Sequence, residues 1–168
     1  WIEIVGGVLL IVGAVANLTT GGDVLQRLFF WSHEIRSFSD DPEFAITAMY
    51  DRFGRTLTPG SRFSYRFGVP LSARGVTDLA DTERVWAVMW DEYGNYYLQY
   101  PPVSIRGRHW NAVSLHPLKG IIEIVFVKVD QAGDASLTQQ AGVSQPSGDW
   151  RLAALPPNSE VVAYVELR

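Results

Sequence analysis

Nineteen consecutive residues without a charge, Ile4 to Gly22, constrain this chain more than any other feature. As an α-helix rising about 1.5 Å per residue, the stretch would be about 28 Å long, close to the hydrocarbon thickness of a bilayer. Glu3 bounds it on one side, and Gly21-Gly22-Asp23 breaks it on the other. We therefore predict a single N-terminal transmembrane helix, with the rest of the chain held at a membrane surface.

Small and polar residues fall on one face of this predicted helix. They recur at i, i+7, i+11 and i+14, and they are Gly6, Gly13, Asn17 and Thr20. Small residues let a second helix approach closely, and an amide in lipid needs a partner. This face is predicted to bind the transmembrane helix of another subunit.

Two other interpretations of the apolar stretch stay open. A cleaved secretory signal has a short apolar core, and Ala14-Val15-Ala16 has the form of a cleavage site, but no basic region precedes it. The stretch could also be a buried helix of a larger soluble fold. The first interpretation requires removal of the segment, and the second requires that it pack against the later residues.

Aromatic residues follow the predicted span and suit the lipid headgroup zone. Phe29, Phe30 and Trp31 stand near Arg27, and an indole has an apolar body with a polar N–H. Residues 1–31 are therefore predicted to comprise the span and an interfacial segment in contact with the lipid bilayer. Basic residues follow the span and none precedes it, which favours a cytoplasmic domain, although basic residues ahead of residue 1 would reverse this orientation.

Composition excludes several classes of function. With 168 residues, the chain has room for one ordinary domain beyond the span. A net charge of -4 and no basic stripe argue against nucleic acid as a partner. The absence of cysteine excludes disulfides, a thiol nucleophile and cysteine-based metal sites.

The soluble part is predicted to begin with a linker over residues 32–43, which is polar and ends in turn-forming residues. A domain over residues 44–168 follows. Ile46, Met49, Tyr50 and Phe53 have the spacing of one helical face, and Gly54 ends the run, so we predict a short amphipathic helix.

Short strands are predicted for most of the remaining domain, separated by turns rich in Gly and Pro. Residues 70–82 are predicted as a loop, and residues 134–140 as a helical turn. Arg84 to Trp90 and Ile121 to Val129 are apolar on both faces, which is typical of central strands covered on both sides. The other strands are predicted at residues 62–67, 96–100, 109–115 and 160–168. This arrangement predicts an all-β antiparallel sandwich.

The order of strands and aromatic residues resembles bacterial immunoglobulin-like sandwich modules. The resemblance covers about Arg62 to Arg168, and its elements are Val85-Trp86-Ala87-Val88, Tyr96-Tyr97-Leu98-Gln99, Trp110, Ile122 to Val127, Gly148-Asp149-Trp150 and Val161-Val162-Ala163. Such modules often hang from membrane anchors. The resemblance implies an immunoglobulin-like fold and transfers no catalytic residue, and the disulfide of antibody-type domains is absent.

Few residues suggest chemistry. His109 and His116 lie at opposite ends of one predicted strand, which disfavours a metal site. His33 follows the interfacial aromatics and is a candidate ligand for a cofactor of a neighbouring subunit, although the chain itself is predicted to carry no cofactor. Tyr93 and Tyr97 belong to a tyrosine-rich hairpin that is a candidate surface for protein or carbohydrate. No hydrolase, phosphate-binding or dinucleotide motif occurs.

These patterns favour a non-enzymatic, single-span membrane protein. Its sandwich domain would act as an accessory or scaffolding subunit of a larger membrane complex, for example a respiratory or photosynthetic one. The alternative is a membrane-tethered binding module for carbohydrate or cell-wall polymer that uses the tyrosine hairpin. A small hydrolase is a third hypothesis.

Overall fold

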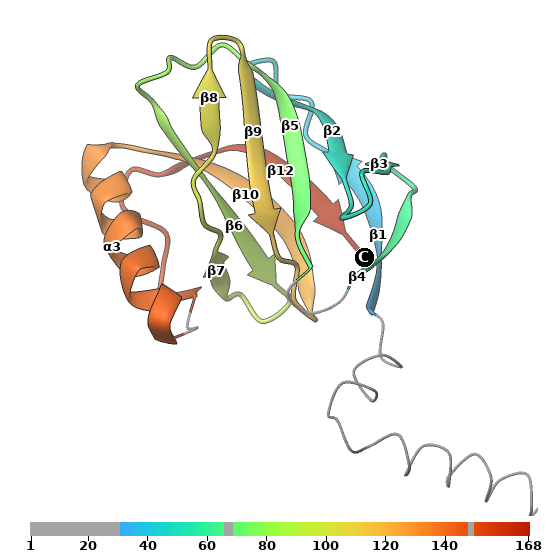
Figure 1. Cartoon of the computed structure of the whole chain (residues 1–168). Coiled ribbons are helices and arrows are strands. Elements are labelled where there is room, and N and C mark those ends of the chain that lie inside the picture. Colours follow the sequence, from blue (N-terminus) through green and yellow to red (C-terminus); the bar gives the residue numbers. More distant parts are fainter. Residues whose placement is uncertain (1–30, 66–68, 148–149) are drawn as a thin grey trace, which may run out of the picture. The chain divides into compact units, whose positions relative to one another are not determined.

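The computed structural model describes residues 31–65, 69–147 and 150–168, and strands make up most of them (Figure 1). The strands form two antiparallel sheets. In spatial order, the larger sheet contains β11 (Arg151–Leu152), β7 (Tyr96–Leu98), β6 (Arg84–Asp91), β10 (Ile121–Val129), β12 (Glu160–Leu167), β1 (Trp31–Phe38) and β4 (Arg62–Tyr65). The smaller sheet contains β3 (Thr56–Leu57), β2 (Phe44–Tyr50), β5 (Leu71–Thr77), β9 (His109–Leu115) and β8 (Ser104–Arg106). The prediction of an all-β sandwich is confirmed.

The main hydrophobic core lies between the two sheets. Both sheets contribute to it, and three aromatic rings meet there, those of Phe44, Trp110 and Phe126. The centroids of Phe44 and Trp110 are 4.4 Å apart with the rings nearly parallel, and those of Trp110 and Phe126 are 5.1 Å apart. Aromatic pairs at these separations stabilise a core beyond the area that they bury.

A helix, α3 (Gln131–Ser147), covers part of the outer face of the seven-stranded sheet (Figure 1). Leu137 and Ala141 of α3 pack with Trp86 and Val127 in a second hydrophobic cluster. The indole Nε1–H of Trp86 also donates to the Asp134 carboxylate at 2.8 Å. Strands β6 and β10 are therefore buried on both faces at the centre of the sheet, which confirms the prediction for both segments.

Helix α3 is longer than the predicted helical turn over residues 134–140. Asp130 precedes it, and the Asp130 carboxylate accepts a hydrogen bond from the Gly133 amide at 2.7 Å, as an N-cap residue does. Leu137 is the one large apolar side chain that α3 buries among its described residues, and Val143 is exposed, so the sequence of α3 lacks a broad apolar stripe. The packing of Leu137 and Ala141 on the sheet stabilises the helix despite this weak sequence pattern.

The segment predicted as a short amphipathic helix is strand β2, so this prediction was wrong. Phe44 and Ile46 alternate at period two, and both pack in the core between the sheets. A shift of register between Ile46 and Ala48 then turns Met49 inward as well, and this irregularity imitates the spacing of a helical face. Phe53, which would have completed that face, lies beyond the strand and is exposed.

Two further segments differ from their predictions. The predicted linker over residues 32–43 largely forms β1, which pairs with β12 through Ile35 and Leu167. The predicted loop over residues 70–82 contains β5, which lies between β2 and β9 at the centre of the smaller sheet. Small inward residues on β5 weaken its apolar alternation, and this explains why the strand was missed.

In the part of the chain that the structure describes, no helix has the length and apolar character needed to cross a membrane. The predicted span, residues 4–22, lies outside that part.

A glycine in β5 makes room for the central indole. A Cβ added to Gly75 would lie 1.8 Å from the Ala45 carbonyl oxygen and 2.6 Å from the Trp110 indole. Both distances are far below ordinary van der Waals contact, and one of the atoms belongs to the backbone. The close approach of β2, β5 and Trp110 therefore requires glycine at this position.

We expect Gly75→Ala to lower the free energy of unfolding by at least about 2 kcal/mol, because overpacking a core forces backbone and side chains out of place. Urea unfolding in mild detergent measures the change. Gly142→Ala is the matched control, since a Cβ on the exposed Gly142 of α3 would meet nothing within 4 Å. It should leave stability unchanged or raise it by up to about 1 kcal/mol. Equal stability of Gly75→Ala and the parent would contradict the packing described.

Candidate functional site

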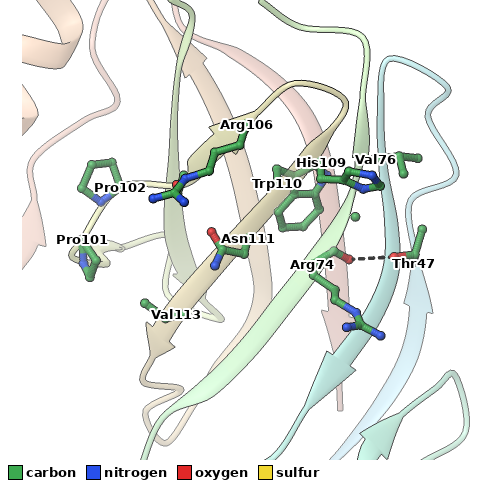
Figure 2. A pocket seen from close by; sticks show the side chains of 12 residues that line it. Thr47, Arg74, Val76, Pro101, Pro102, Arg106, His109, Trp110, Asn111 and Val113 are labelled. Carbon is green, nitrogen blue, oxygen red and sulfur yellow. Dashed lines mark hydrogen bonds between the residues drawn. The ribbon is translucent and has the colours of Figure 1, made fainter. Parts of the chain in front are cut away.

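A groove of about 780 Å³ lies on the outer face of the five-stranded sheet. Strands β2, β5, β8 and β9 form its floor, and a proline pair before β8 borders it (Figure 2). The polar side chains that line it are Thr47, Arg74, Ser104, Arg106, His109 and Asn111.

Strand pairing aligns these side chains into two rows across the sheet. In one row, Arg74 pairs with Asn111, which pairs with Ser104 on β8. In the other row, His109 pairs with Arg106. Successive side chains on a strand point to opposite faces, so the residues between these rows point into the core while the rows face solvent.

Trp110 supports the floor from beneath. Its side chain is only 2% exposed, and its Nε1–H donates to the Ala45 carbonyl at 3.2 Å across the sheet. The indole is therefore held between the sheets and offers no open ring face to a ligand. No Phe or Tyr side chain and no other Trp lines the groove among the described residues.

The border of the groove is fixed by a buried glutamine. The side-chain Oε1 of Gln99 accepts a hydrogen bond from the His116 backbone N–H at 2.8 Å. The backbone N–H of Gln99 donates to the Ala87 carbonyl at 3.0 Å. Pro101 and Pro102 follow, and the Tyr100-Pro101 bond is cis. The chain therefore enters this border from a residue that is held by hydrogen bonds to β6 and to His116.

The groove is locally cationic although the chain as a whole is acidic. Among the residues that the structure describes, Arg74 and Arg106 line it, and no Asp or Glu does. In the described ranges, neither arginine is in an ion pair. Five other arginines do have carboxylate partners, and they are Arg36, Arg55, Arg62, Arg84 and Arg108.

The two unpaired guanidinium groups lie on either side of Asn111. Figure 2 shows Arg106 reaching towards Pro102, whereas Arg74 extends on the β2 side of Asn111. The Arg74 guanidinium lies 4.8 Å from the centroid of the Tyr50 ring, a cation–π contact that leaves its N–H groups available. The site can therefore donate many hydrogen bonds to an anionic ligand.

A second hollow, of about 650 Å³, differs in its charge balance. Lys128 lines it, and its Nζ lies 3.0 Å from Glu160, 3.4 Å from Glu43 and 4.0 Å from Glu83. The hydrogen bond to Glu160 is the largest influence that raises the pKa of Lys128, and burial opposes it. Because three carboxylates already surround this cation, the hollow is a weaker candidate for an anionic ligand.

The structure places the two predicted tyrosines at the turn that Asp91 organises, away from the groove, with Tyr93 in the turn and Tyr97 on β7. Asp91 is buried, and its Oδ1 accepts from the Tyr93 and Asn95 amides at 2.9 and 2.8 Å. Its Oδ2 accepts from the Tyr97 hydroxyl at 3.0 Å. Tyr97 is thus half-buried and tied to the turn, whereas Tyr93 is 80% exposed.

His33 lies inside the domain rather than at a surface facing a neighbour. Its ring is buried and stacks on Phe63 with the centroids 5.6 Å apart. Burial lowers the pKa of His33, and a hydrogen bond with the Arg168 backbone partly opposes this. In this position His33 packs beside the core, and its role as a ligand for another subunit's cofactor stays a prediction.

The other predicted site residues lie at the start of the chain. Trp31 begins β1. The remaining ones, Gly6, Gly13, Asn17, Thr20, Phe29 and Phe30, lie outside the described residues.

Sequence reasoning missed the groove for one reason. Strand β9 was predicted, and its alternation places His109, Asn111 and Val113 on one face. The segment that carries Arg74 was predicted as a loop, so the neighbouring row on β5 could not be recognised. The alternation of residues 71–77 was the signal that would have found it.

Within residues 31–65, 69–147 and 150–168, no cluster of three or more metal-ligating side chains is placed to hold an ion. Comparisons with protein-family models, curated proteins and solved structures gave no match.

We expect Asp91→Asn to lower the free energy of unfolding by about 1–3 kcal/mol at pH 7, because hydrogen bonds to a carboxylate are stronger than those to an amide. Burial alone would raise the pKa of Asp91, but hydrogen bonds from Asn95, Tyr97 and Tyr93 outweigh it and lower the pKa. This stabilisation is complete above the unfolded pKa of about 4 and is lost as the pH falls below it.

The stability difference between the parent and Asp91→Asn should therefore narrow below about pH 4. Urea titrations at several pH values measure it. Asp81→Asn is the control, because Asp81 is exposed and its carboxylate accepts one described hydrogen bond, from the Gly107 amide. If the difference in unfolding free energy between the parent and Asp91→Asn stayed constant with pH, the Asp91 charge would not stabilise the turn.

Proposed function

We propose that this chain is a non-enzymatic binding subunit whose groove receives an extended, acidic segment of a partner protein. One observation carries the proposal: Arg74 and Arg106 face the groove without a carboxylate partner among the described residues. Leaving two guanidinium groups unpaired on one face of the sheet gives no benefit to folding, whereas a ligand carboxylate would pair with either one.

Arginine is suited to this role. Its planar guanidinium binds a carboxylate through two parallel hydrogen bonds, which fixes the orientation of the acid as well as its charge. Asn111 lies between the two arginines and has both a donor and an acceptor for the backbone of an extended segment. The site therefore suits Asp or Glu side chains on either side of a backbone amide.

The chemistry of the lining supports binding over catalysis. His109 is the titratable base in the groove, but no described carboxylate orients it, and no described hydrogen bond joins it to the Ser104 hydroxyl. Nucleophilic catalysis needs a nucleophile and a base within hydrogen-bond reach, with a third group that orients the base. The groove offers ligand-binding groups without that arrangement.

A membrane context for this function rests on the sequence. The apolar stretch over residues 4–22 would tether the sandwich, and its face with Gly13 and Asn17 would dock a neighbouring helix. The chain would then be an accessory or scaffolding subunit of a larger membrane complex. An immunoglobulin-like class for the domain is part of this proposal, and the two facing antiparallel sheets support it.

A carbohydrate-binding module is the second candidate, and the exposure of Tyr93 favours it. An exposed ring can stack on a sugar. Tyr93→Ala is a sharper test of this candidate than Tyr97→Ala, because removing Tyr97 also removes a hydrogen bond to Asp91. Loss of signal on a glycan array with Tyr93→Ala would favour carbohydrate, and an array without any signal would count against it.

We expect a fluorescent polyglutamate peptide to bind the full-length chain in detergent, measured by fluorescence anisotropy. Arg74→Gln/Arg106→Gln should weaken binding at least about tenfold, since about 1.4 kcal/mol of lost pairing changes the affinity by that factor. Affinity should also fall as salt is raised.

The matched control is Arg62→Gln/Arg84→Gln, which removes the same charge from two arginines outside the groove that already have carboxylate partners. It should bind polyglutamate like the parent. Equal weakening by both double variants would show a non-specific charge effect, and unchanged binding by Arg74→Gln/Arg106→Gln would contradict the proposal.

A further inference from the structure

Two turns of this chain have the same construction. The first is Asp51-Arg52-Phe53-Gly54-Arg55, and the second is Asp91-Glu92-Tyr93-Gly94-Asn95. In each, a buried aspartate stands at the end of the preceding strand, Asp51 just after β2 and Asp91 as the last residue of β6. An aromatic residue follows two positions later, and a glycine with positive φ comes next.

The first turn repeats the hydrogen bonds of the second. The Asp51 Oδ1 accepts from the Phe53 amide at 2.8 Å and from the Arg55 amide at 3.0 Å, and its Oδ2 pairs with the Arg55 guanidinium. The corresponding bonds to Asp91 come from Tyr93 and Asn95. Both turns therefore hold the backbone of an aromatic residue rigidly while its ring points away from the domain.

These two aromatic side chains are the most exposed large hydrophobic groups of the described residues. Phe53 is 67% exposed and Tyr93 is 80% exposed. An aromatic ring that a rigid turn holds in water contributes no hydrophobic free energy to folding. An external apolar or interfacial surface is therefore the natural partner of such a ring.

Strand register places both turns at one end of the sandwich. In the larger sheet, Asp91 pairs with Ile121 at the start of β10, and Lys128 lies near the other end of β10. Glu43, which precedes β2, forms an ion pair with Lys128. Strand β2 therefore begins at the end of the sandwich where Lys128 lies. It runs to the opposite end, where Ile121 lies, and the Asp51 turn follows it there.

Strand β1 begins at this same end. Glu123 of β10 pairs with Glu166 of β12, and Leu167 pairs with Ile35, so the residues before Ile35 extend past the Ile121 end (Figure 1). The chain that enters β1 comes from the predicted span over residues 4–22, with eight residues, 23–30, between that span and β1.

Charges at the Phe53 turn suit an anionic surface. The guanidinium groups of Arg52 and Arg55 lie 4.3 and 5.6 Å from the centroid of the Phe53 ring. Arg52 has no carboxylate partner among the ion pairs of the described residues. Glu92 stands beside Tyr93, so the cations are concentrated at the Phe53 turn, and the phenol of Tyr93 supplies a ring with a polar tip.

We propose that this end of the sandwich rests on an anionic lipid surface, with Phe53 and Tyr93 inserted at the headgroup level and Arg52 beside the phosphates. Aromatic rings with a polar neighbour favour that zone, and arginine attracts anionic lipids. The inference rests on the membrane tether of the proposed function, and it does not depend on the groove or its ligand.

The absence of cysteine makes a direct test possible. Single cysteines at Phe53→Cys and Tyr93→Cys, labelled with an environment-sensitive fluorophore, report whether each position meets lipid. The control is Val161→Cys, an exposed position that pairs with Val127 near the opposite end of the sandwich. The full chain is reconstituted in nanodiscs of phosphatidylcholine and phosphatidylglycerol, with and without brominated acyl chains.

Emission at positions 53 and 93 should shift to the blue, and brominated lipid should quench it at least about twofold more than at position 161. Equal quenching at all three positions would overturn the inference, as would failure of the chain to associate with the lipid at all. Polyglutamate binding measured on the same samples reports on the groove separately, so failure of one proposal does not imply failure of the other.

Discussion

The Trp110 indole determines how the two sheets meet. It stacks on Phe44, contacts Phe126 of the opposite sheet and donates its N–H to the Ala45 carbonyl. A buried indole without an acceptor would cost about 1–3 kcal/mol, so this hydrogen bond fixes the position of the ring as well as its burial. The strand between β2 and β9 must then have glycine at position 75, because any side chain there would occupy the place of the indole.

The groove follows from this packing. Because Trp110 and its neighbours fill the inward positions of β5 and β9, the alternate positions with Arg74, Asn111 and His109 must face outward. Their spacing is set by hydrogen bonds between the strands and not by flexible loops. A floor ordered in this way would bind the proposed acidic segment without first ordering itself, which lowers the cost of binding.

Strong local patterns in the sequence predicted the centre of the larger sheet correctly. Strands β6 and β10 are apolar on both faces because the core covers one face and α3 covers the other. The smaller sheet was harder to predict, because a register shift disguised β2 as a helix and the small residues of β5 hid its alternation. The glycine of β5 is required by Trp110, a contact distant in sequence that local patterns do not contain. The groove was missed for the same reason, and the Phe53 turn was missed because its residue was assigned to the helix.

Hydrogen exchange of the Trp110 indole N–H, followed by NMR on the chain in detergent micelles, tests this account most directly. If the indole is held between the sheets and bonded to Ala45, its proton should exchange only when the domain unfolds, and urea should accelerate that exchange together with global unfolding. Exchange of this proton within seconds in native conditions, while the amides of β10 stay protected, would show that the ring does not hold the two sheets together.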